Sequence, residues 1–279
     1  MRMPWGEVAW SGDAGPFEEQ TPWSLFGVHP LPDEDGPIRM LDGSWRRDDE
    51  GHFSVASMGV IADHVTAQGT VVLRPPQFAG LVTSELNLDI VPGVEPVGTI
   101  YGSWEPVGEG AGSALASGRF VDETGQTVAV GTTGVAFFPA PPDAPEVPRA
   151  TPRGIFGETR PVAGVSVDDI LGMSVTLSES GAVGRVVSKP WHLNPADITH
   201  GGVTFAFLEY VGHAALGGWP WQATSVRVSY LRPGQLGEEL TSTAEVVYRG
   251  RSLAVVYGRL TRPDGKDVAV SMTTYRRVE

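Results

Sequence analysis

The feature that most constrains the fold is an internal repeat with an offset of 140 residues. Residues 118–130, GRFVDETGQTVAV, align without gaps to residues 258–270, GRLTRPDGKDVAV, and six of the thirteen positions are identical. The same offset places Leu86, Leu88 and Ile90 on Val226, Val228 and Tyr230. In both halves these residues alternate with polar ones, which is typical of a half-buried strand. The sequence therefore indicates one structural unit folded twice.

Each unit is expected to hold a long apolar helix followed by an antiparallel meander of about four strands, with one strand before the helix. The helices are expected over residues 57–73 and from about 201 to 217. Both are too apolar to lie on a surface, so each sheet should wrap its helix, and two units can pair edge to edge. The loop after the first helix is about six residues longer than its counterpart, and with this allowance Asp63 falls opposite Glu209. The expected fold class is α+β.

Prolines mark the boundary between the two units. Residues 139–152 contain six prolines, a density that neither a helix nor a sheet tolerates. We therefore divide the chain into an irregular N-terminal arm, a first unit, a linker and a second unit. Their predicted bounds are residues 1–22, 23–138, 139–153 and 154–279.

Composition excludes several classes of function. A net charge of −13 argues against nucleic acid as a partner. No apolar run is long enough to span a membrane, the N-terminus carries no apolar leader, and cysteine is absent, which together favour a cytoplasmic protein. The histidines are not in ligand spacing, so neither a metal nor another cofactor is expected. Residues 1–140 hold 19 acidic and 6 basic side chains, whereas residues 141–279 hold 14 of each, so an anionic ligand should approach the second half more easily.

Residues 194–209 concentrate reactive groups in an apolar setting: Asn194, then His200-Gly201-Gly202, then Glu209. Burial raises the pKa of a carboxyl group, which makes it a better base near neutral pH. The backbone N–H groups at the start of a helix can stabilise a developing oxyanion. Structural interpretations also stand: the histidine could cap the helix, the glycines could allow close helix packing, and a carboxylate could pair with arginine.

This spacing resembles the motif of the hotdog-fold acyl-CoA thioesterases of the phenylacetate-pathway type. The resemblance rests on Asn194, on His200-Gly201-Gly202 six residues later, and on a carboxylate nine residues after the histidine. A strand ending Tyr230-Leu231-Arg232-Pro233 and the pair Gly250-Arg251 also fit, so the match covers roughly residues 175–279. The first half resembles the same unit only through the repeat, with Ser57-Met58-Gly59 expected opposite His-Gly-Gly and the asparagine position near Gly51. The whole chain thus resembles a double-hotdog thioesterase, a covalent version of the family's dimer.

In that family the site lies across the dimer interface, which implies two composite sites in a duplicated chain. The first site joins Asn194, His200 and Gly201 to Asp63 as base and Ser84 as the facing strand hydroxyl. The second joins Glu209 and Thr224 to the degenerate first-half motif, so one working site per chain is expected. Gly202, Arg227 and Arg232 are the residues expected to bind substrate, the arginines through the phosphates of CoA.

The resemblance implies hydrolysis of an acyl-CoA or acyl-carrier-protein thioester, with CoA present only as part of the substrate. Two alternatives stay open: a non-catalytic acyl-CoA binding protein, and a hotdog enoyl-CoA hydratase or dehydratase. The second alternative is suggested by His192 and Asp197 flanking the Asn194-Pro195 step. Further association of double-hotdog chains into a homo-oligomer also stays open.

Overall fold

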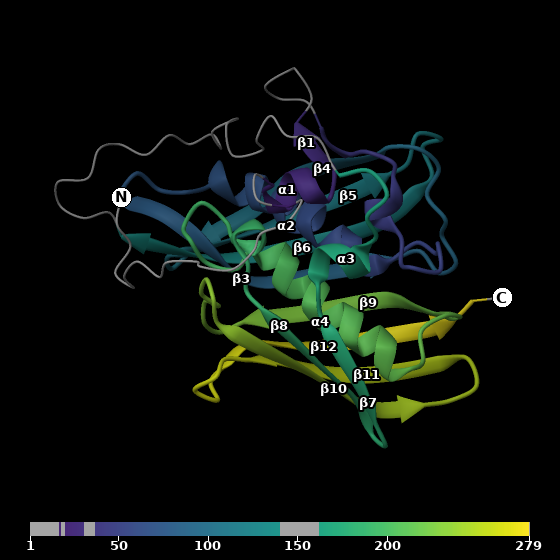
Figure 1. Cartoon of the computed structure of the whole chain (residues 1–279). Helices are drawn as coiled ribbons and strands as arrows, with labels where there is room; N and C mark the ends of the chain where they lie inside the picture. The colour runs from purple at the N-terminus through teal and green to yellow at the C-terminus, as the bar shows by residue number, and fades with distance from the viewer. Residues whose placement is uncertain (1–16, 18–19, 31–36, 140–161, 279) are drawn as a thin grey trace.

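The computed structural model describes residues 17, 20–30, 37–139 and 162–278, and within them the strands form one twelve-stranded antiparallel sheet (Figure 1). The first-unit strands are β1 (Val28–Pro30), β2 (Ile38–Met40), β3 (Phe78–Ile90), β4 (Ile100–Gly110), β5 (Ser113–Val121) and β6 (Thr127–Pro139). The second-unit strands are β7 (Ser174–Ser178), β8 (Gly181–Val187), β9 (Trp221–Tyr230), β10 (Glu239–Arg249), β11 (Leu253–Thr261) and β12 (Asp267–Arg277). The α-helices are α1 (Pro22–Leu25), α2 (Met58–Val71), α3 (Val167–Leu171) and α4 (Gly201–Ala215). Short 3-10 turns occur at η2 (Ser44–Arg46), η3 (Val55–Ser57) and η5 (Pro190–His192).

The strand order in the sheet is β1-β2-β4-β5-β6-β3 followed by β9-β12-β11-β10-β8-β7. The second half of this order is the first half reversed, with each strand replaced by its counterpart in the repeat. The two halves join where β3 pairs with β9, with Leu86 opposite Val228 and Leu88 opposite Val226. These are the alternating strands that the repeat had matched, so the prediction of edge-to-edge pairing is confirmed. Each unit has two strands before its long helix, so the expectation of a single strand is wrong. In the first unit these strands are three residues each, too short to show alternation.

The two long helices lie against the same face of the sheet, and they pack on each other at the boundary between the units (Figure 1). Buried apolar side chains of both helices and of strands from both units form one continuous cluster. The helices approach most closely at two glycines: a Cβ added to Gly59 would lie 2.2 Å from the carbonyl oxygen of Gly202. The helix N-terminus at Gly202 is thereby brought directly against the other unit's helix.

Most of the predicted N-terminal arm lies outside the described residues, and so does the predicted linker beyond Pro139, the last residue of β6. None of the helices in the described ranges is long and apolar enough to cross a membrane.

Candidate active site

Asp63 lies on α2 where that helix faces the start of α4, and the residue is only 6% exposed. The Gly202 N–H donates a hydrogen bond to Asp63 Oδ2 at 3.0 Å, and the Thr83 hydroxyl donates to Oδ1 at 2.9 Å. One donor therefore comes from the second unit and the other from β3 of the first. Groups of both units therefore meet at Asp63.

His200 is the N-cap of α4, and its Nδ1 atom accepts a hydrogen bond from the Gly202 N–H at 3.0 Å. The same Nδ1 lies 3.3 Å from Asp63 Oδ2, so the Gly202 N–H is shared between the imidazole and the carboxylate. Burial lowers the pKa of His200, and the neighbouring carboxylate only partly opposes this effect. A neutral ring that accepts at Nδ1 carries its proton on Nε2. His200 thus caps the helix and touches the carboxylate.

Gly201 is the first residue of α4, and within the described residues its N–H has no hydrogen-bond partner. A Cβ at this position would lie 2.6 Å from Asp63 Oδ2, so any other residue would push the carboxylate away. A free N–H beside a buried carboxylate, at the positive end of a helix dipole, is suited to receive a carbonyl oxygen.

Two rings that the sequence analysis did not single out, those of Trp23 and His64, pack beside His200. Trp23 of α1 lies edge-on to His200, with ring centroids 4.8 Å apart, and also contacts His64 at 5.7 Å. Burial lowers the pKa of His64 to about 3, with a smaller effect from His200, so this ring is neutral. No spacing rule in the sequence linked Trp23 to the site.

Asn194 lies in the loop that leads into His200, and it is half-buried. Its Oδ1 accepts a hydrogen bond from the Ala196 N–H at 2.9 Å, which fixes the turn. Within the described residues no hydrogen bond joins Asn194 to Asp63 or to His200. The structure thus gives this residue a turn-forming role and leaves its predicted contact with substrate as a prediction.

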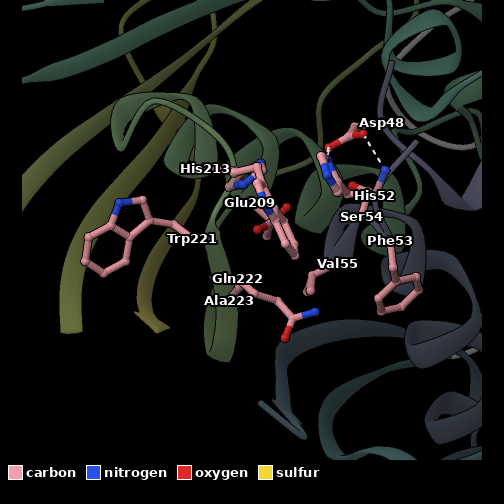
Figure 2. A pocket seen from close by; sticks show the side chains of 11 residues that line it. Asp48, His52, Phe53, Ser54, Val55, Glu209, His213, Trp221, Gln222 and Ala223 are labelled. Atoms are coloured by element: carbon pink, nitrogen blue, oxygen red, sulfur yellow. Dashed lines mark hydrogen bonds and ion pairs between the residues drawn. The ribbon is translucent and has the colours of Figure 1, made fainter. Parts of the chain in front are cut away.

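The second carboxylate, Glu209 on α4, lies in a separate pocket and is 3% exposed (Figure 2). Burial raises the pKa of Glu209 to about 8, although hydrogen bonds from Tyr275 and from the Ala56 N–H partly oppose the shift. At the mouth of the pocket the His52 ring stacks on Trp219, with centroids 4.1 Å apart. The pocket is lined by Asp48, His52, Phe53, Ser54, Val55, Glu209, His213, Trp219, Trp221, Gln222 and Ala223. Glu209 is therefore largely a neutral carboxylic acid at pH 7.

The loops that precede the two helices match each other at an offset of 146 residues. Asp48 N donates to His52 O at 3.0 Å as Asn194 N donates to Ile198 O at 2.9 Å. In the same way Ser54 N donates to Arg46 O and His200 N to His192 O. The counterpart of His200-Gly201-Gly202 is therefore Ser54-Val55-Ala56, and the counterpart of Asn194 is Asp48.

The predicted counterparts, Ser57-Met58-Gly59 and Gly51, are thus wrong by three residues. In the first unit a 3-10 turn precedes α2, so the ordered helix begins later along the chain than in the second unit. No identical residue in the loop marks the correct alignment. The pairing of Asp63 with Glu209, which used the same offset of 146, is supported by the parallel bonds from Gly202 and Ala56.

The strand hydroxyl that meets Asp63 belongs to Thr83, and the structure does not place Ser84 there. Ser84 is the extra residue of a β-bulge, because Thr83 pairs with Val135 and Glu85 with Gly134. A bulge leaves one residue out of the alternation, so the inward position moves by one. Thr224 is the corresponding bulge residue of β9, and its hydroxyl donates to the Thr274 carbonyl at 3.3 Å. The residue that corresponds to Thr83 is Ala223, so the Glu209 pocket has no hydroxyl at that position.

The two arginines expected to hold phosphates have different surroundings. Arg227 makes a bidentate pair with Asp89 at 2.7 and 2.8 Å across the β3–β9 junction, and it also donates to the Leu88 carbonyl. These contacts give it a structural role in joining the halves. Arg232 is exposed and donates to the Asp267 carbonyl at 3.1 Å, so its binding role stays a prediction. Among the described residues no group of three potential ligands could hold a metal ion.

Comparison with known proteins places the chain in a family. The model of the family described as "Thioesterase superfamily" matches residues 196–269. Acyl-coenzyme A thioesterase 13 of Homo sapiens is 30% identical over 99 residues, which cover 32% of this chain and 71% of that protein, and the Pongo abelii protein gives the same values. The chain belongs to the thioesterase superfamily. The matched family region includes the start of α4 and the strands that pack on it.

Two solved structures resemble nearly the whole chain. The tesB protein of Mycobacterium avium subspecies paratuberculosis has a TM-score of 0.62 and 11% identity, over 92% of this chain and 98% of that one. A protein described as an oleoyl thioesterase of Lactobacillus plantarum has a TM-score of 0.58 and 13% identity, over 88% and 96%. At these identities the likeness shows the fold alone, and it confirms the double hotdog.

A pH-dependent stability difference should follow from the burial of Glu209. Its carboxyl has a pKa of about 8 in the folded chain against an ordinary value of 4.5. Between these values the unfolded chain releases the proton while the folded chain keeps it, so Glu209 lowers stability progressively as the pH rises. We expect Glu209→Gln to be about as stable as the parent at pH 4.5 and more stable by up to about 4 kcal/mol at pH 8. Urea unfolding of both proteins at the two pH values measures this difference, and an equal difference at both would contradict it.

Proposed function

We propose that the protein hydrolyses acyl-CoA thioesters at a single composite site, with Asp63 as the general base. The relatives named acyl-coenzyme A thioesterase support the substrate class. The observation that carries the site assignment is the bond from the Gly202 N–H to Asp63, because it places a buried carboxylate beside the free N–H of Gly201 across the unit boundary. The proposed base, Asp63, and the proposed oxyanion donor, the Gly201 N–H, thus both lie at the N-terminus of α4.

In the proposed reaction the thioester carbonyl oxygen accepts a hydrogen bond from the Gly201 N–H. Asp63 removes a proton from a water molecule as that water attacks the carbonyl carbon, and the resulting oxyanion is held at the start of α4. Collapse of the tetrahedral intermediate breaks the carbon–sulfur bond. The products are the carboxylate and CoA thiol, and the proton taken by Asp63 returns to the thiolate or to solvent. Thr83 and Gly202 hold the two carboxylate oxygens of the base.

The Glu209 pocket is a poor candidate for the same chemistry. Its carboxyl group is mostly protonated at neutral pH because burial raises its pKa to about 8, so it cannot accept the proton of water. Val55 replaces the oxyanion glycine, Ser54 replaces the histidine and Ala223 replaces the threonine. Asp48 replaces the asparagine and adds negative charge at the pocket, which opposes a polyanionic CoA ester.

The hydratase alternative needs a histidine that can transfer a proton to the substrate, and His192 is not available for this role. His192 is buried, its Nδ1 accepts from the Lys189 N–H at 3.2 Å, and its Nε2 lies 3.1 Å from the Ile170 carbonyl oxygen. Both ring nitrogens are thus engaged by backbone groups, which leaves neither for proton transfer to a substrate.

The test is incubation of the purified protein with a panel of acyl-CoA esters of different length, and with acyl-carrier protein, in the presence of a thiol reagent. We expect saturable thiol release from at least one acyl-CoA. Thermal stabilisation by acyl-CoA without thiol release would instead indicate a binding protein. A change in absorbance with an enoyl-CoA would indicate hydration, and release from the carrier protein alone would shift the substrate class.

The bulge in β3 gives a matched pair of variants at neighbouring hydroxyls. Thr83→Val removes a donor to the Asp63 carboxylate and is expected to lower kcat by about 10- to 100-fold, the worth of one hydrogen bond to a charged group. Ser84→Ala removes the adjacent bulge hydroxyl and is expected to leave kcat within about twofold. Steady-state thiol release measures both, and equal losses in the two variants would contradict the register described here.

A further inference from the structure

Tyr230, the last residue of β9, contacts the start of α4. Its hydroxyl donates a hydrogen bond to the Gly201 carbonyl oxygen at 2.8 Å. Burial, with a smaller contribution from the Asp63 charge, raises the pKa of the Tyr230 phenol well above its ordinary value. The hydroxyl therefore stays protonated and remains a donor throughout the working pH range.

The carbonyl that accepts this bond belongs to the same peptide unit as the N–H that holds the base. The Gly201 carbonyl and the Gly202 N–H are conjugated through one planar amide. The Gly202 N–H donates to Asp63 Oδ2 at 3.0 Å. A hydrogen bond to the oxygen of an amide polarises its N–H, and such chains strengthen each member by about 10–30%. Tyr230, the peptide unit and Asp63 thus form a continuous chain of donors and acceptors.

We propose that Tyr230 is a positioning residue for the hydrolytic base, acting on Asp63 through the Gly201–Gly202 peptide unit. It fixes the plane of that peptide, and so the direction of the Gly202 N–H toward Asp63 Oδ2. It also strengthens that donor, which favours the ionised carboxylate. The same peptide plane sets the position of the carboxylate relative to the Gly201 N–H. This proposal rests on the proposed function of the site.

The second pocket supplies an internal comparison. There the Ala56 N–H donates to Glu209 as the Gly202 N–H donates to Asp63. The residue that corresponds to Tyr230 at the repeat offset is Ile90, which is buried and has no hydroxyl to donate. Of these two sites, the one at Asp63 has a phenol hydroxyl bonded to the peptide carbonyl, and it is also the site that keeps Thr83, Gly201 and His200.

Few other charges compete for the control of Asp63. The titratable groups that face the site are His64 on α2, His200 at the N-cap of α4 and Tyr230 on β9. Burial lowers the pKa of both histidines, His64 to about 3, so neither supplies a positive charge near neutral pH. The hydrogen bonds that the Asp63 carboxylate accepts come from the Gly202 N–H and the Thr83 hydroxyl.

The test is Tyr230→Phe, with Tyr275→Phe as the matched control. Tyr275 is buried, and its hydroxyl donates to the Glu209 backbone carbonyl at 3.1 Å, so the control removes a phenol hydroxyl that is bonded to the helix carrying Glu209. We expect Tyr230→Phe to move the acidic limb of the kcat/KM profile upward by about half a pH unit and to lower kcat about 3- to 10-fold, with KM unchanged. Tyr275→Phe should leave the limb in place. An unchanged limb in Tyr230→Phe, or an equal shift in both variants, would overturn the proposal.

A direct titration separates this proposal from the proposed function. Carbon-13 NMR of labelled aspartate carboxyls, with Asp63→Asn to assign the signal, reports the ionisation of Asp63 without any substrate. A shifted Asp63 titration in Tyr230→Phe supports the relay even if no thioester is cleaved, whereas an unshifted one defeats it even if hydrolysis is robust. If Tyr230→Phe does not fold, 3-fluorotyrosine placed at position 230 keeps the ring and makes a stronger donor. It is then expected to move the titration downward, and no movement would overturn the proposal.

Discussion

Asp63→Asn is expected to lower kcat/KM for thioester hydrolysis by about 10²- to 10⁴-fold, the usual contribution of a general base. Asparagine keeps nearly the size and polarity of the side chain, and its carbonyl oxygen can still accept a hydrogen bond from Thr83 or Gly202. The change therefore removes the basic oxygen while disturbing the contact between the helices little. Thiol release under kcat/KM conditions measures the effect.

The matched control is Glu209→Gln, the equivalent change in the other helix. It is expected to retain activity within about twofold, because Glu209 is already uncharged near pH 7. In its pocket Ala223 and Ser54 also stand in the places of Thr83 and His200. Full activity in Asp63→Asn together with loss of activity in Glu209→Gln would show that the base has been assigned to the wrong helix. Circular dichroism of both variants establishes that each is folded.

Gly202→Ala is expected to lower the free energy of unfolding by about 3 kcal/mol or more. The added Cβ would lie 2.4 Å from the Gly59 carbonyl oxygen and 2.5 Å from the Val60 Cα. These are backbone atoms of the facing helix, so the clash cannot be relieved by rotating a side chain, and α2 and α4 would have to separate. Separation would break the packing on which the core depends.

Urea unfolding measures this loss, with Gly108→Ala as the control. Gly108 lies in β4, where an added Cβ would meet nothing within 4 Å. The control is expected to change stability by less than about 0.5 kcal/mol. A similar small change in both variants would mean that the helices can accommodate a side chain at their crossing.

The fold was largely predictable because its strongest signals are periodic. Alternation along Leu86–Ile90 and Val226–Tyr230 predicted equivalent half-buried strands in the two halves, and the structure pairs these strands at the junction, with Leu86 and Leu88 opposite Val228 and Val226. The uniformly apolar helices could only be buried, which required a sheet around them. Counting the longer loop after the first helix was enough to pair Asp63 with Glu209. Each of these steps depends on spacing over many residues, which a single irregularity cannot hide.

The details of the site were less predictable because they depend on single-residue irregularities. A β-bulge inserts one residue without a sequence signature, so Ser84 was expected where the structure has Thr83. A short 3-10 turn before α2 shifted the apparent start of the first helix and misplaced the counterpart of the His-Gly-Gly motif by three residues. The bidentate pairing of Arg227 with Asp89 depends on cross-unit register, which no local pattern reveals.

The antiparallel junction of β3 with β9 makes the two halves neighbours within a single polypeptide. In a dimer of identical chains, one codon specifies both copies of each residue, so no substitution can reach one catalytic centre and spare the other. Here Ala223 and Thr83 are encoded separately, as are Ser54 and His200. In a fused chain, one centre can therefore change while selection maintains the other. The divergence around Glu209 is a change that a dimer of identical chains could not inherit.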